Sequence, residues 1–149
     1  MQVLKRISGE NIDLMSKNDL VTYKLNKEEE ILHVFVKSKK KNNYEFYIDN
    51  KYPFKCPFKI IVNNKDYYMH ALYLIPKFKK LLKKLDNKEC LCCSSITCQD
   101  KWSPAKRLWQ LVDEGDEMIA IKQKIFYLYY TRLIAENFLT HDIPLERYL

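Results

Sequence analysis

The residues best suited to do chemistry lie in one short stretch, the cysteine segment Cys90–Cys98, which holds four of the five cysteines. A thiolate in this segment could act as a nucleophile and carry an acyl group as a thioester, without a metal or a glycine-rich loop. The same thiols could instead bind zinc, or serve as small apolar residues of the core. We find no phosphate-binding glycine motif, no Ser-His-Asp signature and no paired-carboxylate site, so these three interpretations compete.

The zinc interpretation would use the four thiols of the cysteine segment, with His70 as a further ligand. Common zinc sites join two knuckles far apart in sequence, usually as Cys-x-x-Cys, whereas these four thiols all lie within nine residues. The spacing disfavours zinc, and we expect neither a metal nor an organic cofactor. The structural interpretation suits Cys56 and Cys98 best.

Composition limits the class of protein and its compartment. The 149 residues carry a net charge of +7 and are 47% hydrophobic, which favours a single domain, residues 1–149, with a real core. The cysteines are odd in number and crowded, unlike a secreted disulfide framework, and the N-terminus lacks the apolar core of a signal peptide. We therefore expect a cytoplasmic or nuclear protein. No stretch approaches the roughly 20 apolar residues of a membrane span, so we expect no membrane partner.

The positive charge and the residue usage add two weaker expectations. Most basic residues are Lys rather than Arg, which is a poor choice for bidentate recognition of phosphates or bases, so nucleic acid is an unfavoured partner. A basic nucleic-acid-binding domain stays as an alternative class, with binding that weakens steeply with salt. Abundant Lys, Asn, Ile and Tyr indicate an AT-rich genome, such as that of a protist or a large DNA virus; for a virus, the compartment would be the host cytoplasm.

Hydrophobic patterning predicts an α+β fold. A short first helix is expected within residues 1–17, because Ser8-Gly9 interrupts its pattern. Four strands at short spacing indicate an antiparallel meander: Leu20–Leu25, Ile31–Val36, Tyr44–Ile48 and Phe58–Val62. Three further helices are expected: a Lys-rich amphipathic insert within residues 71–85, then Ala105–Glu114 with Ser103 as N-cap and Pro104 at N1, and, after Gly115, Met118–Phe138.

Two blocks of sequence, and a shorter third one, carry a resemblance to a known family. Tyr52-Pro53-Phe54-Lys55-Cys56-Pro57 resembles the Tyr-Pro-Phe-Lys-Pro-Pro block of ubiquitin-conjugating enzymes, which follows a three-strand meander and precedes the fourth strand. Trp102-Ser103-Pro104-Ala105 is similar to the Trp-Ser-Pro-Ala that opens the helix after the active-site cysteine of that family. Leu4-Lys5-Arg6-Ile7 resembles the start of its first helix. Taken together in chain order, the three blocks extend over most of residues 1–115.

The resemblance implies a thioester nucleophile in the cysteine segment, but three cysteines compete for the role. Cys93 is our first choice, because Cys93-Ser94-Ser95-Ile96 fits a Cys-x-Ser-Ile pattern and needs the smallest insertion before the Trp-Ser-Pro-Ala block. Cys92, preceded by an apolar residue, and Cys90, which keeps a Cys-Leu pair, are the alternatives. The His-Pro-Asn of the family is missing, and Asn87 is the nearest upstream amide that could replace its Asn, thought to position the active-site loop or stabilise the oxyanion.

The implied activity is transfer of ubiquitin or a ubiquitin-like modifier from an activating enzyme to Cys93, and then to a substrate lysine, with or without a ligase. By resemblance, Lys5 and Arg6 would face the activating enzyme, while Phe54, Ser103, Pro104 and Ala105 would form the ligase-binding surface. The alternative within this fold is a catalytically inactive variant that binds ubiquitin or a partner.

Overall fold

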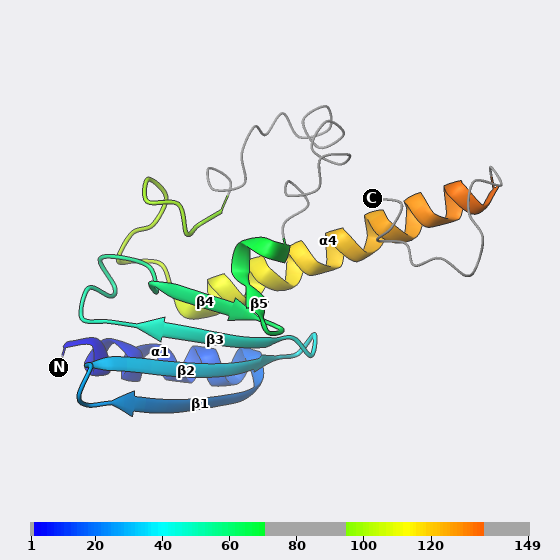
Figure 1. Cartoon of the computed structure of the whole chain (residues 1–149). Coiled ribbons are helices and arrows are strands. Elements are labelled where there is room, and N and C mark those ends of the chain that lie inside the picture. Colours follow the sequence, from blue (N-terminus) through cyan, green and yellow to red (C-terminus); the bar gives the residue numbers. More distant parts are fainter. Residues whose placement is uncertain (1, 71–94, 136–149) are drawn as a thin grey trace.

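The chain forms a five-stranded antiparallel sheet that α-helices cover on one face, as the computed structural model shows (Figure 1). The structure describes residues 2–70 and 95–135. The elements, in chain order, are α1 (Gln2–Lys17), β1 (Asn18–Asn26), β2 (Ile31–Ser38), β3 (Asn43–Ile48), β4 (Lys59–Val62), β5 (Lys65–Asp66), the 3₁₀ helix η1 (Tyr67–His70) and α4 (Leu108–Ala135). The α+β class predicted from the sequence is therefore confirmed.

The sheet is a simple meander in the order β1-β2-β3-β4-β5, in which every strand pairs antiparallel with its sequence neighbours. The first four strands lie within two residues of their predicted bounds. The prediction of only four strands is wrong, because β5 forms a fifth. Asn63 and Asn64 turn the chain between β4 and β5 with positive φ values of 50° and 65°, and asparagine favours this conformation in two-residue hairpins.

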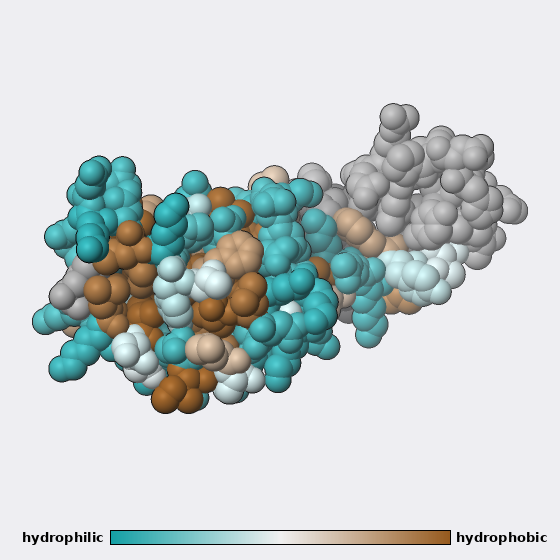
Figure 2. Space-filling model, turned by 90° about the horizontal axis from the view of Figure 1, so that it is seen from below, coloured by the Kyte–Doolittle hydropathy of each residue, from teal (hydrophilic) through white to brown (hydrophobic). Residues whose placement is uncertain are grey.

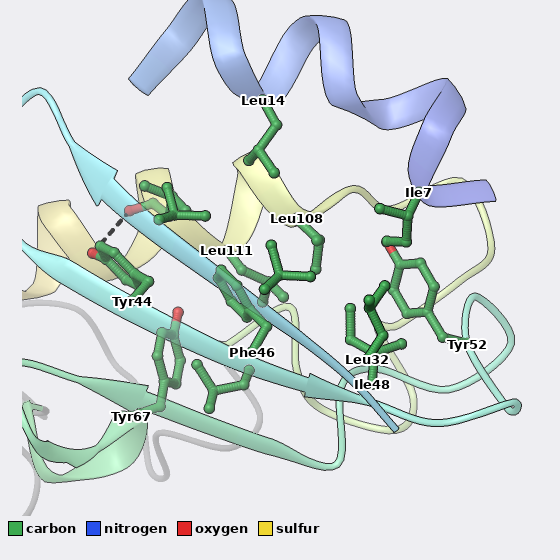
Figure 3. Close-up of a cluster of buried hydrophobic side chains, with 14 of the residues drawn as sticks. Ile7, Leu14, Leu32, Tyr44, Phe46, Ile48, Tyr52, Tyr67, Leu108 and Leu111 are labelled. Carbon is green, nitrogen blue, oxygen red and sulfur yellow. Dashed lines mark hydrogen bonds between the residues drawn. The ribbon is translucent and has the colours of Figure 1, made fainter. Parts of the chain in front are cut away.

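One hydrophobic core joins the sheet to both helices. Leu32, Phe46 and Ile48 face Ile7 and Leu14 of α1, together with Leu108 and Leu111 of α4 (Figure 3). All of these side chains are buried. The alternation of buried and half-buried residues along β2 and β3 places every second side chain in this core. Since both helices contribute to one cluster, both cover the same face of the sheet.

Helix α1 is longer than predicted. It runs unbroken for 16 residues through Ser8-Gly9, so the expectation of a short, interrupted helix is wrong. Glycine costs about 1 kcal/mol in a helix interior, but buried residues recur at helical spacing along one face. Packing of this face on the sheet outweighs the local cost. These residues are Val3, Ile7, Glu10 and Leu14.

Helix α4 is one continuous helix of 28 residues, where the sequence predicted two helices separated at Gly115. Gly115 is buried inside the helix instead of ending it, and a Cβ atom there would stand 2.5 Å from the Tyr44 hydroxyl oxygen. Glycine therefore lets α4 approach β3 closely, and the Tyr44 hydroxyl donates a hydrogen bond to the carbonyl of Val112 at 3.1 Å (Figure 3). The expected end at Phe138 lies outside the described residues, as does the Lys-rich helix predicted within residues 71–85.

The start of α4 also differs from the prediction. The helix begins at Leu108 rather than Ala105, and Ser103 is not its N-cap. Residues 103–106 form a turn closed by a hydrogen bond of 2.9 Å from the Lys106 amide to the Ser103 carbonyl. The Gln110 side chain reaches back to accept from the Arg107 amide at 2.8 Å, which is half of a capping box. Pro104 is therefore a turn residue and not the first residue of the helix.

Candidate functional site

Two polar centres and one exposed surface make up the candidate site. The predicted nucleophiles Cys93, Cys92 and Cys90, together with Asn87, lie outside the described residues. The described residues resume at Ser95, two positions after Cys93. They include the end of the cysteine segment and the two motif blocks, Tyr52–Pro57 and Trp102–Ala105.

The end of the cysteine segment is tied to α4 through the Glu114 carboxylate. Glu114 Oε1 accepts hydrogen bonds from the hydroxyls of Tyr67 and Ser95, each at 2.5 Å. Glu114 Oε2 accepts a hydrogen bond from the Ile96 amide at 2.9 Å. We call Tyr67, Ser95, Ile96 and Glu114 the Glu114 centre. Its donors come from η1 and from the cysteine segment, so this carboxylate joins both of them to α4.

A second layer of hydrogen bonds surrounds the Glu114 centre. The Ser95 hydroxyl lies 2.8 Å from the Thr97 hydroxyl and accepts from the Thr97 amide at 3.1 Å. The Tyr68 hydroxyl lies 2.5 Å from the same Thr97 hydroxyl. Ser95 and Thr97 are only 2% and 7% exposed. The segment that follows Ser94 is thus buried and held through side chains from two other elements.

Cys56 and Cys98, the two cysteines of the described chain, are both half-buried and free. The Cys56 thiol donates a weak hydrogen bond to the Thr97 carbonyl at 3.7 Å. Burial raises the pKa of the Cys56 thiol, which keeps it protonated and lowers its reactivity. This environment agrees with the structural role predicted for Cys56 and places the Tyr52–Pro57 block beside the end of the cysteine segment.

The two motif blocks meet directly, although about 50 positions separate them. The Trp102 indole donates a hydrogen bond to the Pro53 carbonyl at 2.8 Å. The rings of Tyr52 and Trp102 lie with their centroids 6.1 Å apart. The Tyr52-Pro53 peptide bond is cis. Side chains of both blocks reach solvent beside this contact: Phe54 is 71% exposed, and Pro104 and Ala105 are exposed as well, while Ser103 is half-buried.

A buried carboxylate on α1 anchors the first motif block and the start of α4. Glu10 of α1 is 0% exposed; it accepts hydrogen bonds from Arg6 at 2.7 Å, from the Tyr52 hydroxyl at 2.6 Å and from the Leu108 amide at 3.0 Å. We call Arg6, Glu10, Tyr52 and Leu108 the Glu10 centre. It ties α1 to the first motif block and to the start of α4.

Arg6 extends the Glu10 centre to the second motif block. Its guanidinium donates hydrogen bonds to the carbonyls of Pro104 at 2.6 Å and Lys106 at 3.1 Å. The Arg6 side chain is thus engaged within the molecule, whereas the neighbouring Lys5 is exposed. The resemblance implies that both residues face the activating enzyme, and that assignment stays a prediction; the structure adds that Arg6 also supports the second motif block from within the molecule.

A third carboxylate on α4 is built in the same way as Glu114 but lies elsewhere. Asp116 Oδ1 accepts from the Ser38 hydroxyl at 3.0 Å, the side-chain amide of Asn42 at 2.8 Å and the Tyr44 hydroxyl at 2.8 Å. We call these four residues the Asp116 centre. Its donors all belong to β2, β3 and the turn between them, so it holds the sheet and not the cysteine segment.

No metal site is found where the structure describes the chain. No three His, Cys, Asp or Glu side chains there come together around a possible ion. His70, named as an extra zinc ligand, has its Nε2 atom 2.7 Å from the Val62 carbonyl, and burial lowers the pKa of its imidazole. Within the same residues, no helix has the length and hydropathy to cross a membrane.

A groove of about 230 Å³ lies between α1 and β1. Its lining is Leu4, Ile7, Ser8, Asn11, Tyr23 and Leu32. Figure 2 views the molecule from below, the side on which β1 lies in Figure 1, and shows hydrophobic residues gathered there among hydrophilic ones. The lining contains no cysteine, histidine or carboxylate, so the groove offers neither a thiol nor a strong general base that could activate the Ser8 hydroxyl.

Sequence reasoning missed Glu114, Tyr67 and Tyr68. A usable signal was the position of Glu114 three residues after Leu111, on the flank of the apolar stripe of α4, where a carboxylate needs partners. The partners themselves could not be inferred, because they lie 18 to 47 positions away.

In comparisons with known proteins, no family model, curated protein or solved structure matches this chain.

Proposed function

We propose that this chain is a divergent ubiquitin-conjugating enzyme with the fold of that family. Cys93 is the proposed nucleophile, with Cys92 and Cys90 as alternatives. It accepts ubiquitin, or a ubiquitin-like modifier, from an activating enzyme and passes it to a substrate lysine. The reaction needs neither a metal nor an organic cofactor.

The observation that carries the proposal is the contact between the two motif blocks. The hydrogen bond from Trp102 to Pro53 places the Tyr52–Pro57 block next to the Trp102–Ala105 block. Phe54, Pro104 and Ala105 are exposed beside this contact, as expected for a surface that a ligase would bind. A motif that matched by chance would have no reason to meet the other one in space.

The order of elements gives further support. A first helix, an antiparallel meander, the Tyr52–Pro57 block and a fourth strand precede the cysteine segment, and a helix follows the Trp-Ser-Pro-Ala block. The Glu114 centre holds the chain immediately after the proposed nucleophile. This arrangement suits a reaction in which a thiol must meet a large protein substrate in a fixed geometry.

The proposed chemistry is two acyl transfers. The Cys93 thiolate attacks the thioester carbonyl carbon of the modifier carried by the activating enzyme; the new C–S bond forms as the old one breaks, and the departing thiolate takes up a proton. A neutral lysine amine then attacks the Cys93 thioester, forming an amide, releasing the thiol and losing one proton. The Asn of the family's missing His-Pro-Asn has no assigned counterpart in the described residues, and Asn87 remains the proposed replacement.

The test is loading of the purified full chain. We would incubate it with activating enzyme, ATP and ubiquitin, and look on a non-reducing gel for an adduct that thiol reductant removes. Cys93→Ala is expected to abolish the adduct, with Cys90→Ala and Cys92→Ala as matched controls that retain it. Cys93→Ser is expected to form an oxygen ester that survives reductant, because thiols do not exchange with it.

The outcomes separate the candidate functions. An adduct lost only in Cys90→Ala or Cys92→Ala would move the nucleophile to that residue. If neither ubiquitin nor any ubiquitin-like modifier forms an adduct, the enzymatic proposal is wrong, and the inactive, partner-binding variant takes its place.

A further inference from the structure

The strongest unassigned feature of the molecule is the Glu114 centre. Both carboxylate oxygens of Glu114 are occupied, and every described donor is neutral: two hydroxyls at 2.5 Å and one backbone amide at 2.9 Å. Burial, and next the negative charge of Glu114, raise the pKa of Tyr67, so its hydroxyl keeps the proton that it donates. The carboxylate therefore acts as a fixed acceptor for groups from two other segments.

The position of the anchored residues gives the centre its significance. Ser95 lies two positions after Cys93, and two residues of extended chain span at most about 7 Å. The anchor at Ser95 and Ile96 is therefore joined to the proposed nucleophile by only a short covalent link. The Thr97 contacts with Ser95 and Tyr68 add a second attachment at the same place.

We propose that Glu114 is a positioning residue for the reaction of Cys93. It does not touch the reacting atoms; it fixes the chain that leaves the nucleophile and so sets the geometry in which the thioester forms. This inference rests on the proposed function, because it assigns a role within that reaction. A misplacement of about 1 Å can lower a rate by two orders of magnitude, which makes such an anchor consequential.

The Asp116 centre provides a matched control on the same helix. Like Glu114, Asp116 accepts from one tyrosine hydroxyl and two further donors. It differs in tying α4 to the sheet, away from the cysteine segment. Asp116→Ala therefore removes a comparable set of hydrogen bonds without releasing Ser95 and Ile96.

The experiment compares the full-length wild type with Glu114→Ala, Glu114→Gln and Asp116→Ala. Loading with modifier from charged activating enzyme in excess is followed in single turnovers. Its dependence on activating-enzyme concentration separates the maximal loading rate constant, here called kcat, from the half-saturating concentration, here called KM. Hydrogen exchange is measured on peptides that contain Ile96, since its amide donates to Glu114. Thermal unfolding shows which temperature keeps all four proteins folded.

A positioning role predicts that Glu114→Ala lowers kcat by at least about tenfold with little change in KM. Glu114→Gln should fall between wild type and Glu114→Ala, because one carbonyl oxygen still accepts the hydroxyls while the amide group cannot accept from Ile96. Protection of the Ile96 amide should be lost in both Glu114 variants. Asp116→Ala should load at a rate within about twofold of wild type and keep Ile96 protected.

Three results would overturn the proposal in distinguishable ways. Equal losses of kcat in Glu114→Ala and Asp116→Ala would reduce Glu114 to a general stabilising residue. Lost Ile96 protection with unchanged loading would leave an anchor that the reaction does not need. If wild type loads no modifier, the proposed function fails and the kinetic role fails with it, while exchange at Ile96 still decides whether the anchor exists.

Discussion

The Glu10 centre and the Glu114 centre solve the same task with different chemistry. Each uses one carboxylate to join parts of the chain that are far apart in sequence. Glu10 is fully buried and pairs with a cationic guanidinium, whereas the described donors to the half-buried Glu114 are all neutral. The Glu10 centre lies under the exposed motif surface, and the Glu114 centre holds the end of the cysteine segment.

The difference in burial and in the charge of the partners predicts different roles for the two centres. A buried carboxylate with a charged partner is costly to disrupt, because its loss leaves several polar groups without partners. When a half-buried carboxylate is removed, water can take over part of its hydrogen bonding. We therefore expect the Glu10 centre to govern stability, and the Glu114 centre to govern the geometry of the segment that it holds.

The largest effect is expected for Glu10→Ala. We predict a loss of about 3 kcal/mol in the free energy of unfolding, because the Tyr52 hydroxyl and the Leu108 amide would remain buried without an acceptor. Glu114→Ala should cost only about 1–2 kcal/mol. Urea unfolding followed by circular dichroism measures both values. A cost for Glu114→Ala equal to that of Glu10→Ala would remove the proposed division between the two centres.

The next effect is expected for Gly115→Ala, next to Glu114. Where space is available, alanine stabilises a helix by about 1 kcal/mol relative to glycine. Here the new Cβ would stand 2.5 Å from the Tyr44 hydroxyl oxygen, and we predict a net loss of about 2 kcal/mol. Thermal unfolding gives the sign. Gly9→Ala is the control, since a Cβ there meets no atom within 4 Å and should raise the melting temperature.

A smaller effect is expected when each centre loses a single hydroxyl. Tyr52→Phe removes a donor from the Glu10 centre and should cost about 1–1.5 kcal/mol. Tyr67→Phe removes a donor from the Glu114 centre and should cost about 0.5–1 kcal/mol, because Ser95 and Ile96 still donate. Denaturant midpoints of both variants test this order, and a larger cost for Tyr67→Phe would reverse the comparison.

The last prediction concerns the ionisation of Tyr52 and Tyr67. Its effect on stability is the smallest of the four near neutral pH and becomes clear in alkali. Burial raises the pKa of Tyr52 and Tyr67 above the usual value of 10.0. A raised pKa in the folded state means that stability is fully present below about pH 10 and falls as the pH rises beyond it. Each tyrosine should contribute less than about 1 kcal/mol of this loss at about pH 10.5. The Phe variants should lose correspondingly less stability between about pH 9 and pH 11 than wild type, and an unchanged pH profile would argue against burial of the hydroxyl.

Much of the fold could be predicted from local patterns. Alternating apolar residues gave the first four strands, because burial of one face imposes a period of two. The fifth strand has only two residues and no hydrophobic pattern, so the Asn63-Asn64 turn was its one local signal. Gly115 misled the helix prediction because its role depends on Tyr44, 71 positions away, which no local pattern reveals.

The candidate site divides in the same way. The two motif blocks were identified from their own residues, and their meeting through Trp102 agrees with what the resemblance implies. The resemblance assigned Arg6 to a partner-facing surface, and its internal contacts could not be predicted, because its acceptors, the carbonyls of Pro104 and Lys106, are backbone atoms that a sequence does not mark as special. Glu114 escaped notice because its importance depends on which donors reach it.

One consequence of the Glu114 centre concerns tolerance to change in chain length. Tyr67 and Ser95 both donate to one oxygen of Glu114, so this carboxylate brings together the two flanks of the stretch between them. The separation of Tyr67 and Ser95 is therefore set by α4 and not by the number of residues between them. A change of chain length in that stretch would leave the residues that enter and leave it in place.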